Sequence, residues 1–165
     1  MPRYVLVDAA LWQENIDSLW LEGFTYRSLF RGTAQQKLYT VAPYLVDISV
    51  SGVEFIKEIV QQDPVKRRVT WLHSELSIDD LRKHLRRFLR MKTKTGMYIY
   101  SRFYDPYVAD CVFPNLTSAQ LNEFFAPIEY LITEDVRINE RCVFYLSADK
   151  ELRIKYKAIN YVDNK

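Results

Sequence analysis

Residues 68–90 read RVTWLHSELSIDDLRKHLRRFLR and contain a complete strand-to-helix transition. The opening segment 68–74 is rich in apolar and β-branched side chains, which predicts a β-strand. Ser77 stands three residues before Asp80, as in a capping box, and predicts the first turn of a helix. Asp79 and Asp80 would meet the positive end of that helix and stabilise it. We therefore expect a strand followed by a helix that continues to the end of the quoted stretch.

The same order of elements occurs twice before this stretch. Residues 3–7 (RYVLV) predict a strand, and the apolar pattern of residues 11–20 predicts a helix after it. Residues 44–49 (YLVDIS) predict a second strand, followed by a helix over residues 53–60. Three successive strand-then-helix units are typical of α/β proteins, in which helical crossovers align strands in parallel. We expect an α/β fold with a mixed, partly parallel sheet that is covered by helices.

The second half of the chain has a different pattern. Residues 97–104 (MYIYSRFY) predict a long strand that pairs antiparallel with residues 89–93 across a tight turn. Thr117 predicts the start of a short helix that Pro127 ends. After residue 141, the segments CVFYL and LRIKYKAI on either side of a polar SADKE turn predict a C-terminal β-hairpin.

The composition is that of one globular domain. The chain has 165 residues, of which 48% are hydrophobic and 27% are charged. We assign residues 1–132 to the body of the domain and residues 133–165 to a short hairpin appendage of the same domain. Only four glycines are present, and they form neither a phosphate-binding loop nor the GxSxG turn that presents a nucleophilic serine. The sequence therefore nominates no cofactor, metal ion or catalytic group.

Two features of the sequence favour a protein of the cytoplasm. Cys111 and Cys142 stand far apart with no CxxC motif, which is typical of reduced thiols. The sequence contains neither the apolar core of a signal peptide nor an apolar run long enough to cross a bilayer. We expect no contact with a membrane.

A basic stripe lies between residues 82 and 94 and contains no acidic residue. Its members are Arg82, Lys83, Arg86, Arg87, Arg90, Lys92 and Lys94. Helical spacing places Arg82, Arg86 and Arg90 in one row that faces solvent or a partner. With the aromatic residues that follow, the stripe allows an alternative function as a small nucleic-acid-binding module. The low net charge of +2 disfavours that alternative.

The chain offers four side chains for metal or thiol chemistry, namely His73, His84, Cys111 and Cys142. A thiol enzyme or hydrolase centred on one cysteine and a histidine is a second alternative, although no spacing among the four brings them together. His84 lies on the apolar side of its helix, which favours a hydrogen-bonded core histidine. Cys111 has apolar neighbours and is expected to be a small buried side chain.

Charged residues also occur at two predicted strand ends. Asp8 ends the first strand, where it either serves a site or caps the next helix. In the segment RFYDP, Arg102 within the predicted long strand needs a carboxylate partner, which Asp105 or another acid supplies. Pro106 directs the chain out of the strand, and Asp105 is placed to cap the helix that follows. The segment predicts a fixed corner between a strand and a helix.

Four segments in this order resemble the conserved domain of type VI secretion effector adaptors, which are also called effector chaperones. They are GTAQQKLYTVAPYLV (32–46), HLRRF (84–88), RFYDP (102–106) and LTSAQLNEFFAPI (116–128). Together with YVLVDAA near the start, the resemblance covers roughly residues 4–132. Members of this family commonly have a basic residue after the YDP motif, where this chain has Tyr107.

The resemblance implies a non-enzymatic protein in the cytoplasm of a Gram-negative bacterium. Such adaptors bind a toxic effector and help to load it onto the VgrG spike, or onto a PAAR-type tip, before secretion. The family motif residues that this chain shares are expected to be structural. They are His84, Arg86, Arg87, Arg102, Tyr104, Asp105 and Pro106.

We expect the contact surface for the effector to be the C-terminal hairpin with nearby exposed aromatic residues. A strand near the terminus offers an edge to which a partner strand adds, and basic residues attract an acidic partner. The residues expected to form this surface are Tyr107, Tyr145, Arg153, Lys155, Tyr156, Lys157 and Tyr161.

Overall fold

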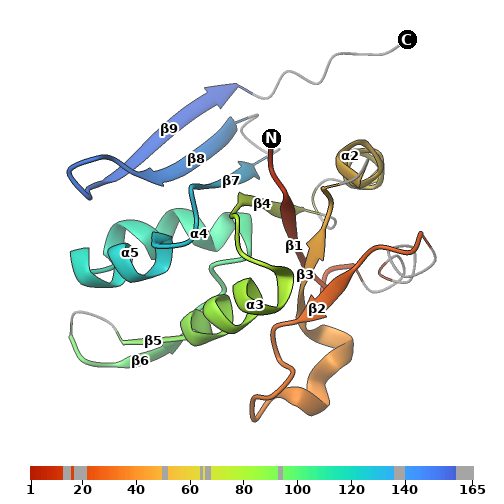
Figure 1. Ribbon diagram of the computed structural model, residues 1–165, viewed down its shortest axis with the longest axis horizontal. Coiled ribbons are helices and arrows are strands. Elements are labelled where there is room, and N and C mark those ends of the chain that lie inside the picture. Colours follow the sequence, from red (N-terminus) through yellow and green to blue (C-terminus); the bar gives the residue numbers. More distant parts are fainter. Residues whose placement is uncertain are drawn as a thin grey trace.

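A large antiparallel sheet runs through the molecule (Figure 1). The computed structural model describes residues 1–12, 16, 22–49, 52–63, 65, 68–92, 95–135 and 140–158. Within these residues, seven strands form the sheet in the order β2-β3-β1-β4-β7-β8-β9. They are β1 (Tyr4–Asp8), β2 (Tyr26–Ser28), β3 (Pro43–Asp47), β4 (Val69–His73), β7 (Tyr130–Asp135), β8 (Glu140–Leu146) and β9 (Leu152–Ala158). Every neighbouring pair is antiparallel.

The prediction of a partly parallel sheet is therefore wrong for the described strands. Helix α2 (Gly52–Gln62) joins β3 to β4, as a crossover between parallel strands would. However, β1 lies between these two strands, so that Tyr4 is opposite Asp47 on one side and Leu72 on the other. Because every residue of β1 is buried, both of its edges need a hydrogen-bonding partner. Helix α2 was predicted correctly, but the position of β1 between β3 and β4 was not predicted.

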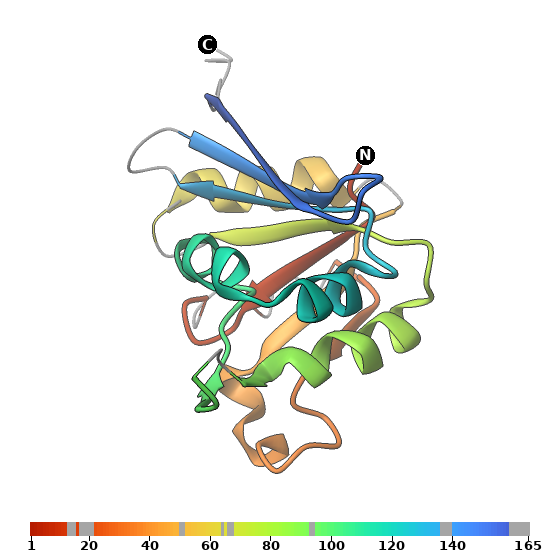
Figure 2. The same cartoon turned by 90° about the vertical axis from the view of Figure 1, so that its left-hand side faces the viewer.

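Helices cover both faces of the sheet (Figure 2). Helix α2 lies on one face, and α3 (Ile78–Arg86), α4 (Pro106–Val112) and α5 (Ser118–Phe125) lie on the other. Short 3₁₀ helices complete the described set: η1 (Gln36–Val41), η2 (Arg87–Leu89) and η3 (Phe113–Asn115). No helix in the described ranges is long and apolar enough to span a membrane.

The helix starts follow the predicted caps in two cases. The Ser77 hydroxyl accepts a hydrogen bond from the Asp80 amide at the start of α3. Thr117 forms a capping box with Gln120 at the start of α5, and this helix ends just before Pro127. The 3₁₀ helix η1 begins at Gln36 without a side-chain cap. The helix predicted over residues 11–20 lies mostly outside the described residues.

Aromatic rings fill the space between the sheet and the helices α3, α4 and α5. The ring of Phe124 is fully buried and lies within 5.2 Å, centroid to centroid, of the rings of Phe88, Phe103 and Phe113. Phe113 in turn contacts Phe144 of β8. The helices and the C-terminal part of the sheet therefore share one core.

The predicted antiparallel hairpin before α4 is present but short. Strands β5 (Arg90–Lys92) and β6 (Tyr98–Tyr100) form a separate two-stranded sheet. The long strand predicted over residues 97–104 is wrong, because Arg102 lies in the turn that leads to α4. Asp105 caps this helix, which ends the extended conformation early. The C-terminal hairpin of β8 and β9 is confirmed, and it continues the main sheet by pairing with β7.

Candidate functional site

Four charged side chains meet where β1 ends and α4 begins. Asp105 accepts hydrogen bonds from Nε and Nη2 of Arg68 at 2.9 and 3.0 Å. Nη2 of Arg102 lies 2.6 Å from Asp8 and 3.2 Å from Asp105. The carboxylates are almost fully buried, with side-chain exposures of 4% for Asp8 and 3% for Asp105. Burial shields the two carboxylates from water, so their charges depend on the arginines beside them.

The same carboxylates also hold the backbone. Asp8 accepts a hydrogen bond from the Ala10 amide, and Asp105 accepts one from the Tyr107 amide at the start of α4. The buried Tyr104 contributes its carbonyl, which accepts a hydrogen bond from the Thr70 hydroxyl of β4. The predicted corner is thus anchored to two neighbouring strands of the sheet.

Arg68 was not predicted as part of this corner. It directly precedes β4, and antiparallel pairing with β1 places it beside Asp8. Its guanidinium also lies 4.3 Å from the centre of the Tyr107 ring. Tyr107, expected as an exposed anchor, is therefore half-buried on α4 and covered by a cation. From sequence alone, a basic residue just before a strand does not reveal its carboxylate partner, because the neighbouring strand is not known.

The basic stripe divides into paired and unpaired cations. Arg87 pairs with Glu123, and Lys83 pairs with Asp80. Arg82 and Arg86 instead donate hydrogen bonds to the carbonyl of Arg31, at 2.9 and 3.3 Å. Four cations of the stripe and the neighbouring Arg31 have no carboxylate partner among the described residues. The four are Arg82, Arg86, Arg90 and Lys92. Lys94 lies outside the described residues.

Like charges crowd around Arg82. Burial lowers the pKa of Arg82, and the positive charges of Arg86, Arg31 and Arg27 lower it further. Asp79 opposes this effect, but its carboxylate is engaged by Arg27. The surface along α3 therefore carries positive charge that the described part of the protein does not neutralise.

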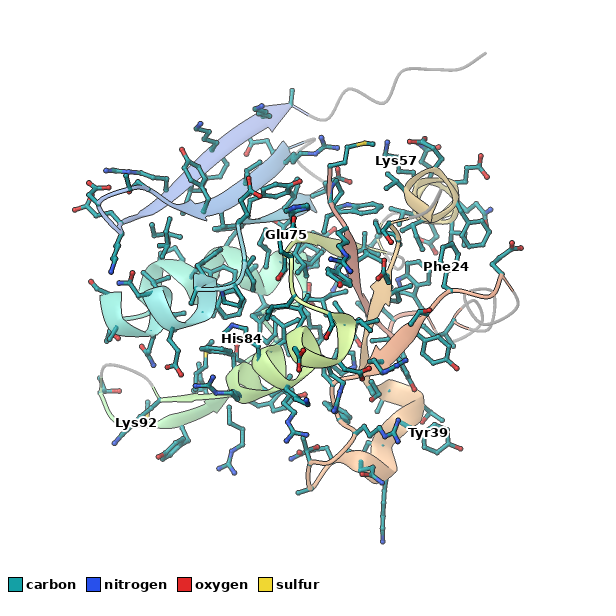
Figure 3. All side chains as sticks on the ribbon, viewed as in Figure 1. Phe24, Tyr39, Lys57, Glu75, His84 and Lys92 are labelled. Atoms are coloured by element: carbon teal, nitrogen blue, oxygen red, sulfur yellow. The ribbon has the colours of Figure 1, made fainter. Side chains whose placement is uncertain are left out.

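His84 makes the predicted hydrogen bond from the inner side of α3. Its Nε2 donates to the carbonyl of Phe124 at 2.8 Å, and its ring contacts Phe88 (Figure 3). Burial lowers the pKa of His84, so the ring is neutral near pH 7. The histidine joins α3 to the end of α5.

The two cysteines lie in different environments. Cys142 is buried on β8, and its thiol points to the Asp110 carboxylate at 3.9 Å. Burial and this carboxylate raise the pKa of Cys142 to about 12. Cys111 on α4 is exposed, contrary to the expectation of a buried thiol. The hydrogen bonds of the two histidines go to other residues than the cysteines: His84 bonds to the Phe124 carbonyl and His73 to Glu75.

We expect alkylating reagents to modify Cys111 and to spare Cys142 in the folded protein. At pH 8 the Cys142 thiol stays protonated, because its pKa is raised, and burial excludes the reagent. Mass spectrometry after iodoacetamide treatment should show modification of Cys111 at least about 100-fold faster. In denaturant both thiols should react alike. Equal rates in the native protein would contradict this arrangement.

The predicted contact residues of the C-terminal hairpin lie on two faces. Tyr145 is opposite Arg153 in the β8–β9 register and lies on the outer face, where the Lys155 ammonium is 5.0 Å from its ring centre. Lys157 shares this face by strand alternation. Tyr156, 60% exposed, is opposite Cys142 and lies on the helix-facing side. Tyr161 lies outside the described residues.

Many exposed apolar side chains lie outside the contact surface that was predicted at the C-terminal hairpin. Two segments carry most of them, namely η1 and the β5–β6 hairpin. The exposed members are Leu38, Tyr39, Val41, Met97, Tyr98, Ile99 and Tyr100. The sequence predicted that the MYIY segment is part of a long strand, and its aromatic residues entered only the nucleic-acid alternative. Its exposure follows from the position of the hairpin outside the main sheet, which local sequence does not encode.

An apolar groove lies against one face of this hairpin. It has a volume of about 400 Å³ and is lined chiefly by Met91 and Ile99 on one side and Val112 and Leu116 on the other. Cys111 also lines this groove. The molecule thus offers two candidate binding surfaces, the C-terminal hairpin and the β5–β6 hairpin with its groove.

These features define a mixed α/β protein built on an antiparallel sheet, with exposed hairpins at its periphery. Residues 3–123 match the model of DUF4123, a domain of unknown function, and the chain belongs to this family. The match contains the corner at Arg102 and Asp105 and ends within α5, before strands β7 to β9. No curated protein and no solved structure matches the chain.

Proposed function

We propose that this protein is an adaptor of type VI secretion. It binds a toxic effector in the cytoplasm and helps to load it onto the VgrG or PAAR component of the spike, without covalent chemistry. Membership of the DUF4123 family supports this proposal, together with the four motif segments that resemble effector adaptors. The partners are an effector protein and a spike component.

The observation that carries the proposal is the open edge of β9. This strand of seven residues has β8 on one side and no strand of the described part on the other. Its outward-facing Lys155 and Lys157 have no ion pair with a described carboxylate, whereas Arg153 pairs with Asp149 and Glu151. An open strand edge beside unpaired lysines suits the addition of an acidic strand from another protein.

We expect charge reversal at Lys155 and Lys157 to weaken the complex with the effector that is encoded beside this protein. The change replaces attraction by repulsion at the open edge and should lower affinity about 10-fold or more at low salt. Co-purification of the two coexpressed proteins, followed by titration calorimetry, measures the effect. Deletion of the hairpin is a poor test, because Phe144 is part of the core.

The control is Lys57→Glu, which reverses an exposed lysine on α2 instead of on β9 (Figure 3). This variant should bind the effector like the original protein. Binding that survives the Lys155 and Lys157 changes would move the effector site to residues 3–123. Absence of any complex with the neighbouring effector or with VgrG would overturn the proposed function.

A further inference from the structure

The small β5–β6 sheet has an open edge of its own. The Ser101 amide donates to the Leu89 carbonyl, so residues 99 and 101 point their backbone groups toward β5. Alternation in antiparallel strands then directs the N–H and C=O groups of Tyr98 and Tyr100 away from β5. The outer edge of β5 is different, since the Gln120 side chain donates to the Lys92 carbonyl there. Among the described residues, the free edge is therefore that of β6.

The two faces of this hairpin have different chemistry. On one face, the cations of Arg90 and Lys92 lie 5.7 and 5.9 Å from the ring centre of Tyr98. On the other face, Met91 and the 40% exposed Ile99 border the apolar groove. A strand added to β6 would present alternate side chains to these two faces.

The positive face continues beyond the hairpin. The Tyr100 ring contacts Phe30, and the next residue, Arg31, accepts the hydrogen bonds of Arg82 and Arg86. The unneutralised cations of α3 thus adjoin those of the hairpin. A partner that supplies carboxylates on this side would relieve the repulsion among them.

We infer that the edge of β6 binds an extended segment of a partner protein in which acidic and apolar residues alternate. Acidic side chains of the segment meet Arg90 and the α3 arginines, and apolar side chains enter the groove beside Ile99. The inference takes one point from the proposed function, namely that the partner of this chain is a protein. It assigns a second binding place, separate from β9, so that one adaptor holds two polypeptides.

The apolar groove favours this occupant over a nucleic acid. Nucleic-acid bases bind by stacking on aromatic rings that lie beside cations. Only the face of the hairpin that carries Tyr98 offers such a ring with cations beside it. The groove on the other face is lined by aliphatic side chains such as Ile99 and Leu116, which do not stack with bases. A sugar-phosphate backbone has no apolar side chain to place in this groove. A polypeptide uses both faces of the hairpin at once.

A short peptide of alternating glutamate and isoleucine tests the inference on the full chain. Its binding should slow hydrogen exchange at the amides of Tyr98 and Tyr100 about 10-fold or more, because free amides become bonded. It should also slow alkylation of Cys111, whose side chain lines the groove. Ile99→Asp and Arg90→Glu should each lower the peptide affinity about 10-fold. Arg153→Glu, a matched change on the other hairpin, should leave the affinity measured from protection of the Tyr98 and Tyr100 amides unchanged, even where the acidic peptide also adds to β9.

Three control ligands define the outcomes that overturn the inference. A peptide of the same composition with its residues in two blocks should not protect the β6 amides, nor should an analogue N-methylated at alternate amides. A thymidine oligonucleotide should bind no better than the block peptide. Protection by the oligonucleotide alone would assign the surface to nucleic acid. Absence of protection by the alternating peptide, or loss of binding on Arg153→Glu only, would reject the β6 site while leaving the effector complex to be judged by co-purification.

Discussion

Replacing Asp105 by alanine is expected to lower the free energy of unfolding by about 3–5 kcal/mol. The change leaves Arg68, only 14% exposed, without its two hydrogen bonds to a carboxylate. It also removes one of the two carboxylates beside Arg102 and the cap at the start of α4. A buried cation that loses its partner keeps the cost of desolvation without the compensating attraction.

Urea denaturation followed by circular dichroism measures this change. Asp79→Ala is the matched control, because Asp79 also lies in the first turn of a helix and accepts two hydrogen bonds from an arginine, Arg27. That pair is exposed to solvent, so its loss should cost clearly less than the loss of Asp105. Asp105→Asn should fall between the two alanine variants, since it retains a capping oxygen but loses the charge. Equal costs at Asp105 and Asp79 would show that burial adds nothing to the corner.

Replacing Phe124 by alanine is the second large expected effect, with a loss of about 3–5 kcal/mol in the free energy of unfolding. The ring is fully buried and contacts four other phenylalanine rings around it, those of Phe88, Phe103, Phe113 and Phe125. Its removal leaves a cavity between α3, α5 and the sheet that the rigid aromatic neighbours are unable to fill. The same packing of α5 against α3 supports the His84 hydrogen bond to the Phe124 carbonyl.

Two further substitutions serve as comparisons for Phe124→Ala in the same urea experiment. Phe124→Leu should cost clearly less, because the larger side chain fills part of the cavity. Tyr98→Ala should change stability by less than about 1 kcal/mol, since its side chain is 68% exposed. A cost at Phe124 no greater than that at Tyr98 would contradict the aromatic core. The Tyr98 variant also serves as a folded protein for the peptide experiment.

Short-range features of the fold could be predicted from the sequence. The cap at Ser77, the start of α5 at Thr117 and the C-terminal hairpin each depend on residues that are close in the chain. The sheet order depends on long-range pairing, and the insertion of β1 between β3 and β4 has no local signal. The strand-to-helix pattern therefore predicted the elements but gave the wrong strand direction for neighbouring pairs.

The candidate site divides in the same way. Pairing of Arg102 with Asp105 or another acid was expected, and both Asp105 and Asp8 are its partners. Arg68 was missed because its carboxylate partner lies far along the chain. The aromatic segment at Tyr98 was considered only for the nucleic-acid alternative. Its position in a hairpin outside the main sheet, next to an apolar groove, depends on long-range packing and has no local signal.

The central position of β1 has a consequence for synthesis of the protein on the ribosome. This strand leaves the exit tunnel before both of its partners, since β3 begins at Pro43 and β4 ends at His73. Until His73 has emerged, the apolar residues of β1 and at least one of its hydrogen-bonding edges remain uncovered, which is a hazard for aggregation. Strands β7, β8 and β9 pair in chain order and close as they emerge. The nascent chain therefore needs protection early in translation, and the last strands complete a sheet that is already in place.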